Sequence, residues 1–181
     1  MVVRAQRTQW RRVLVWGALG GVIAGMAMAM WTMVASGTWL HYGVFTPLYA
    51  IATIFLSPHA QQVSEHAGAW WWATGPALVG GVIHMVDSMA LGAIFAMMVA
   101  LLRLRGPALL MGAMIYALAA MGILTSVGVA IGATNLGTLF HWWVWTVGHL
   151  MFGAVLGLWV LMQRRRLTAP VEEAVALPRV A

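Results

Sequence analysis

Residues 76–105 read PALVGGVIHMVDSMALGAIFAMMVALLRLR, an apolar run that two arginines close. Apolar runs of about 18 residues or more are typical of transmembrane helices. This run also holds Asp87, an acid that follows His84 by one helical turn. The stretch therefore predicts a membrane span with ionisable side chains inside it.

The composition of the whole chain fits the same class. Its 181 residues are 62% hydrophobic and 8% charged, too little charge to cover the surface of a soluble domain. The chain has no cysteine, which excludes disulfides and thiolate metal sites. The net charge of +6 comes from arginines, most of which flank apolar runs. That placement indicates membrane topology and anionic lipid head groups rather than nucleic acid.

The apolar runs predict an all-α membrane protein, a four-helix transmembrane bundle. Residues 1–12 form a basic cytoplasmic N-terminus, residues 13–162 the transmembrane domain, and residues 163–181 a basic, disordered cytoplasmic tail. The predicted spans within the domain are 13–35, 77–102, 108–131 and 142–162.

The connection at residues 36–75 is an outer loop with a short apolar segment. Residues 46–56 read TPLYAIATIFL, too short to cross a bilayer, so this segment is predicted to be interfacial or re-entrant. Trp70, Trp71 and Trp72 then indicate a membrane boundary, where an indole buries its ring and keeps its N–H hydrated.

Arginine clusters predict the orientation. They precede the first span, separate the second from the third and follow the fourth, whereas the other two connections contain no Arg or Lys. The positive-inside rule places the clusters, and with them both termini, in the cytoplasm. We expect a multi-pass protein of the bacterial cytoplasmic (inner) membrane.

Polar groups inside the spans are the candidate site. His84 and His149 each lie about 12 Å below the outer boundary, since a helix rises about 1.5 Å per residue. Small residues recur around both histidines at four-residue spacing, which predicts that they point into the bundle with Asp87. Thr125 and Ser126 in the third span, and Met26 and Met30 in the first, are expected at a similar depth.

Three interpretations of this group stay open. His84, Asp87 and His149, with methionine, could hold a transition metal or haem. His84 and Asp87 could instead form a proton or ion path. The third interpretation is a network of interhelical hydrogen bonds, which contribute about 0.6–2 kcal/mol each in membranes.

Other chemistry has little support in the sequence. His59, Glu65 and His66, with His41, form a second cluster, which predicts solvated side chains or a surface metal contact. The chain lacks GxSxG, Walker A and HExxH motifs, and Asp87 and Ser88 diverge by about 100° on a helix, which argues against a triad. We therefore expect no enzyme activity.

Short motifs in the spans resemble the YagU-like (DUF1440) family of bacterial inner-membrane proteins. The resemblance rests on Gly21-Val-Ile-Ala-Gly25, on His84 with Ser88 and Phe95-Ala96, and on Gly148-His149-Leu150 before a basic end. It implies a small multi-pass inner-membrane protein without an assigned activity, in which His84 and His149 matter. Asp87 departs from the pattern, since an apolar residue is expected there.

The expected function is that of a non-enzymatic structural or accessory membrane component in contact with the lipid bilayer. The ridge of Gly17, Gly21 and Gly25 is expected to be exposed and to mediate homo-oligomerisation or contact with a membrane partner. The alternative is a metal- or haem-binding protein, or a small proton or ion transporter, that uses His84, Asp87 and His149.

Overall fold

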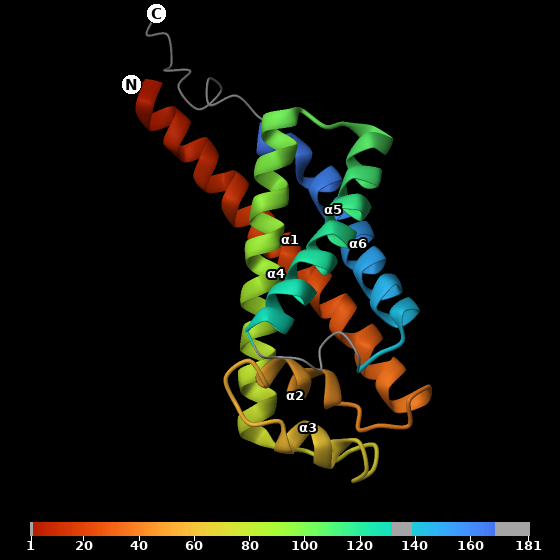
Figure 1. Ribbon diagram of the computed structural model, residues 1–181. Helices are drawn as coiled ribbons and strands as arrows, with labels where there is room; N and C mark the ends of the chain where they lie inside the picture. The colour runs from red at the N-terminus through yellow and green to blue at the C-terminus, as the bar shows by residue number, and fades with distance from the viewer. Residues whose placement is uncertain (1, 132–138, 169–181) are drawn as a thin grey trace, which may run out of the picture.

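The computed structural model describes residues 2–131 and 139–168, which are mostly helical and contain no strand. Four of the helices in these ranges are long and apolar enough to cross a membrane, which confirms the predicted all-α transmembrane fold (Figure 1). The helices are α1 (Val2–Thr38), α2 (Thr46–Ala52), α3 (His59–Ser64), α4 (Thr74–Leu102), α5 (Gly106–Ala130) and α6 (Trp142–Thr168).

The ends of the helices extend some of the predicted boundaries. α1 begins at Val2, so the basic residues before position 13 continue the first helix rather than precede it. Arg, Gln and Ala are good helix formers, and no Pro or Gly interrupts them. α6 continues to Thr168, so the first part of the tail predicted to be disordered is helical. Residues 169–181 lie outside the described residues.

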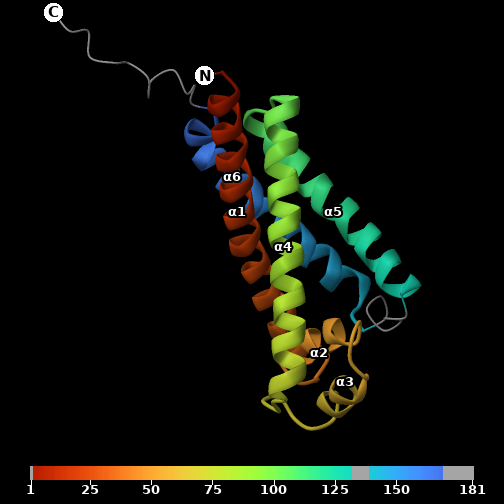
Figure 2. The ribbon, with the colours of Figure 1, turned by 90° about the vertical axis from the view of Figure 1, so that its left-hand side faces the viewer.

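The long helices do not pack in chain order. α1 lies between α4 and α6, and α6 packs against α5. α4 and α5 are joined by a short turn but make few contacts, and Figure 2 shows α5 running away from α4 beyond that turn. The beginning of α1 and the end of α6 lie at the same end of the bundle as this turn (Figure 1).

Glycines bring α1 and α4 into backbone contact. A Cβ added at Gly21 would collide with the carbonyl oxygen of Ser88, and one added at Gly92 would lie 2.6 Å from the Cα of Gly21. Gly17 meets the Cβ of Ala96 in the same way, at 2.6 Å. The expectation that the glycine ridge of α1 is exposed was therefore wrong, since α4 covers it.

α5 is held mainly by α6. A Cβ at Gly153 would lie 2.7 Å from the carbonyl oxygen of Ala113, so the two backbones touch there. On the other side, Tyr116 donates a hydrogen bond to the carbonyl oxygen of Leu91 at 2.9 Å, which ties α5 to α4. α5 therefore packs closely against α6 and makes few contacts with α4.

The turn between α4 and α5 is built from special backbone conformations. Arg103 ends α4 in the left-handed region, at φ 54°, and Gly106 also has a positive φ of 53°. Pro107 then occupies the first turn of α5, where its missing N–H costs nothing.

The short helices α2 and α3 lie at the opposite end of the bundle, beside the first turns of α4 (Figure 1). α2 approaches α4 so closely that a Cβ at Gly80 would collide with the carbonyl oxygen of Leu48. Buried Tyr49 accepts a hydrogen bond from the N–H of Ala73 at 2.9 Å and donates one to the carbonyl oxygen of Trp71 at 3.3 Å. Burial raises the pKa of the Tyr49 phenol, so it stays neutral while it makes these bonds.

The close α1–α4 contact predicts that adding one methyl group at this contact lowers the thermal stability of the protein. Gly21→Ala should lower the midpoint of thermal unfolding in detergent, because overpacking costs about 1–3 kcal/mol. The matched control is Gly122→Ala on α5, where an added Cβ would meet nothing within 4 Å. Circular dichroism on heating measures both, and equal midpoints for the two variants would contradict the tight contact.

Candidate functional site

A cavity of about 490 Å³ lies where α4 and α5 diverge. Its walls come from α1, α4, α5 and α6, and α2 contributes Pro47, Ile51 and neighbouring residues. It occupies the half of the bundle near α2 and α3, away from the arginine-rich ends. The exposed side chains of Val86 on α4 and Val127 on α5 also line it, so its mouth lies between these two helices. In a bilayer such a mouth faces the lipid.

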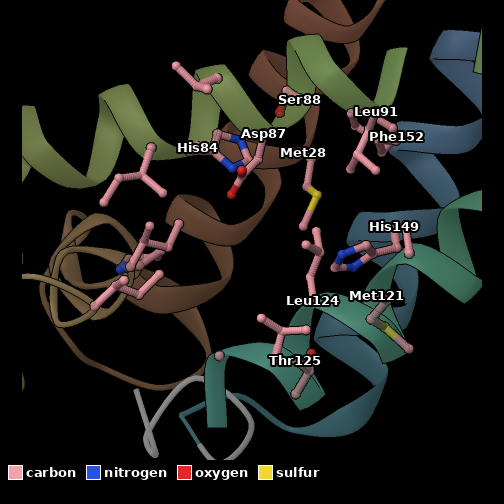
Figure 3. A pocket seen from close by; sticks show the side chains of 18 of the residues that line it. Met28, His84, Asp87, Ser88, Leu91, Met121, Leu124, Thr125, His149 and Phe152 are labelled. Carbon is pink, nitrogen blue, oxygen red and sulfur yellow. The ribbon is translucent and has the colours of Figure 1, made fainter. Parts of the chain in front are cut away.

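Most of the lining is apolar, and the polar residues come from several helices. Figure 3 shows His84 and Asp87 on α4 and His149 on α6 around the same space, with Met28 of α1 between them. A mainly apolar wall with a few convergent polar groups is the usual form of a small-molecule site.

His84 makes a hydrogen bond that links two helices. Its Nε2 lies 3.0 Å from the carbonyl oxygen of Gly25 on α1. A carbonyl oxygen can only accept, so Nε2 carries the proton and donates it. In the neutral imidazole Nδ1 is then left as an acceptor.

His149 shows the opposite arrangement. Its Nδ1 lies 2.9 Å from the carbonyl oxygen of Trp145, one turn earlier on α6, so Nδ1 is the donor. Nε2 is the free acceptor of the neutral ring. The side chain is buried and lines the cavity, where it points toward Met28 and Leu124 (Figure 3).

Asp87 lies on the cavity wall without a hydrogen-bonding or ion-pair partner among the described residues. Its side chain is exposed at the mouth of the cavity and lies beside His84 (Figure 3). Placing a carboxyl group at the depth of the membrane costs about 2.5–3.5 kcal/mol of insertion free energy. This cost suggests that Asp87 has a functional role.

Trp145 adds an unused donor to the same wall. Its indole Nε1 is buried and has no hydrogen-bond partner among the described residues. The ring packs edge-on against Phe140, with centroids 5.2 Å apart, and against the His149 ring at 5.9 Å. Trp145 was not among the residues predicted for the site from the sequence.

The methionine of α1 that lines the cavity differs from the two that were expected at the depth of the histidines. Met26 and Met30 are 52% and 64% exposed, whereas Met28 is buried and lines the cavity. Each residue advances about 100° around a helix, so alternate positions face away from each other. The buried glycines recur every four residues along one face of α1. The same face continues three residues after Gly25, at Met28, and four residues later, at Thr32. The glycine spacing could therefore have identified Met28 and Thr32 as residues that face the site.

The third span gives a similar division. Thr125 lines the cavity, whereas Ser126 is exposed and donates to the carbonyl oxygen of Gly122 at 2.8 Å. Thr125 is therefore part of the site and Ser126 is not.

The candidate ligands do not form a metal centre within the described ranges. No group of three His, Asp or Glu side chains comes together there in a way that could hold a metal ion. His84 and Asp87 lie beside each other on α4, and His149 faces them across the cavity, so the three do not form such a group (Figure 3). His41, His59 and His66 are exposed, and Glu65 accepts a hydrogen bond from Gln61 at 3.0 Å.

Comparisons of the chain with protein-family models, with curated proteins and with solved structures found no match. The resemblance to the YagU-like family therefore stays a prediction.

The hydrogen bonds to backbone carbonyls predict different tautomers for the two histidines. Neutral His84 should carry its proton on Nε2, and neutral His149 on Nδ1. Solid-state NMR of protein labelled with ¹⁵N-histidine distinguishes the two forms, and His84→Gln and His149→Gln assign the signals. The same tautomer at both positions would contradict the described geometry.

Proposed function

We propose that this chain is a non-enzymatic membrane component that binds a small lipid-soluble molecule in the cavity between α4 and α5. The observation that carries the proposal is the cavity itself. Its volume of about 490 Å³ falls within the range of small-molecule sites, about 300–1,000 Å³. Its mouth between two transmembrane helices gives access from the bilayer rather than from water.

The arrangement of α5 supports entry by this route. α5 packs closely on α6, and its tie to α4 includes the Tyr116–Leu91 hydrogen bond. A helix held along one side can move away from its neighbour at lower cost than one packed on both sides. A molecule dissolved in the bilayer could therefore enter without disrupting the α1–α4 contact.

Two other functions stay open as predictions. Asp87 at the mouth of the cavity favours a proton or ion path as the second candidate. Ion flux in proteoliposomes that Asp87→Asn abolishes, with the variant still folded, would establish that path. A metal or haem site has less support, because no three candidate ligands within the described ranges come together in a way that could hold a metal ion.

Occupation of the cavity is tested by filling it. Ala120 is buried and lines the cavity, so Ala120→Phe should exclude an apolar molecule. Ala119 is exposed and outside the lining, so Ala119→Phe adds the same ring without blocking the site. We expect native mass spectrometry from detergent micelles to show bound dodecanol with the wild type and Ala119→Phe, and much less with Ala120→Phe. Equal binding by all three would sink the proposal.

We also propose that the protein lies in the bacterial cytoplasmic membrane with both ends in the cytoplasm. The support is the arginine pattern together with the fold, which brings the start of α1, the α4–α5 turn and the end of α6 to one end of the bundle. A membrane complex or homo-oligomer stays a prediction, although the buried glycine ridge of α1 no longer supports it.

Labelling of introduced cysteines tests the orientation, since the chain has none of its own. Gln62 on α3 and Pro107 beside the arginine turn are both exposed and uncharged. We expect a membrane-impermeant maleimide to label Gln62→Cys in intact spheroplasts, and Pro107→Cys only after permeabilisation. The reverse pattern would show that the protein is inverted.

A further inference from the structure

We infer that the cavity recognises a cationic amphiphile with a primary ammonium head, a long-chain amine, through Asp87, His84 and His149. This inference rests on the proposed function and names the class of molecule that the cavity would bind. Several polar atoms around the cavity have no hydrogen-bond partner among the described residues.

Those unused atoms are mostly acceptors. The carbonyl of Gly25 takes the Nε2 proton of His84, and the carbonyl of Trp145 takes the Nδ1 proton of His149. Each neutral imidazole therefore keeps a nitrogen with a free lone pair. The Asp87 carboxylate adds oxygens that have no hydrogen-bond partner among the described residues. A complementary head group must donate hydrogen bonds.

The charge of the wall favours a cation. The residues that line the cavity, as far as the chain is described, include Asp87 and no Arg or Lys. An ionised carboxyl without a partner is costly away from water, and a positively charged ligand would offset that cost. A charge-assisted hydrogen bond to a carboxylate is also stronger than one between neutral groups.

The spacing of the acceptors favours an organic cation over a metal ion. A metal ion needs its ligands within about 2.0–2.6 Å, and these side chains are not grouped for that. A primary ammonium has three N–H donors that radiate from one atom, with longer bonds of about 2.7–2.9 Å. It can bond the carboxylate, turn a second proton toward neighbouring His84, and reach His149 across the cavity through water (Figure 3).

The rest of the cavity suits a hydrocarbon tail. Leu91, Met121 and Leu124 line it opposite or beside the polar groups, and the mouth opens toward the bilayer. A zwitterionic phospholipid head also carries an ammonium, but its phosphate would meet no Arg or Lys side chain among the described lining residues. The site therefore fits a molecule with a single positive charge.

Three probes that share a dodecyl chain separate the contributions of charge and hydrogen bonding. Dodecylammonium has both, dodecyltrimethylammonium has the charge without N–H donors, and dodecanol has no charge. We expect native mass spectrometry from uncharged detergent micelles to give dodecylammonium an apparent Kd lower than the other two by about tenfold or more. Asp87→Asn should remove this preference, because it removes the negative charge that the ammonium would meet.

The matched control is Glu65→Gln, which removes an acid outside the cavity and should keep the preference. Equal affinity of the wild type for the three probes would overturn the inference, and this comparison does not depend on the stability of any variant. If dodecanol still binds and Ala120→Phe abolishes its binding, the proposed function stands and the head group is wrong. If no probe binds, both are wrong.

Dihexanoyl phosphatidylethanolamine tests the lipid as a source of the ammonium. Binding as tight as that of dodecylammonium would show that the cavity tolerates a phosphate and would overturn the assignment to a singly charged amine. Binding at least about tenfold weaker is the expected result.

Discussion

The approach of α1 to α4 at backbone distance is the constraint on which the other packing depends. Lipid tails are as apolar as leucine, so helices in a bilayer gain little from hydrophobic burial and associate through close packing and hydrogen bonds. Gly21 and Gly92 allow that packing because neither carries a side chain that would separate the helices. With α4 on its glycine face, α1 offers its other faces to α6. There, Trp159 donates to the carbonyl oxygen of Trp16 at 2.9 Å, and Trp31 donates to that of Val144 at 3.0 Å.

The cavity follows from this arrangement rather than from a dedicated binding domain. α1 holds both α4 and α6, and α5 can then pack closely on α6 alone. The angle between α4 and α5 leaves a space that is lined mainly by apolar residues, and the polar atoms of His84, Asp87 and His149 border it. The contacts of α1 with α4 and α6, and of α5 with α6, stabilise the fold and also hold α4 and α5 apart on either side of the cavity.

The number and approximate limits of the spans could be predicted because they depend on local properties, namely the length of an apolar run and the residues at its ends. His84 and His149 were expected at a similar depth, since the rise of a helix is fixed, and both line the cavity. Rotation about the helix axis was harder. Met26 and Met30 were expected from their depth, but the face of α1 that meets the cavity is set by its glycines and contains Met28. Which helix covers the glycine ridge could not be predicted, because a small-residue surface suits any partner helix.

The order of packing has a consequence for biogenesis. Membrane helices leave the ribosome in chain order, yet α1 finds its partner only when α4 has been synthesised, after α2 and α3. The hairpin of α4 and α5 makes few contacts of its own, so α5 lacks a close partner until α6 follows. α5 must therefore wait in the translocon or in the bilayer with its small-residue face unpaired. The last helix, rather than the hairpin turn, completes the bundle.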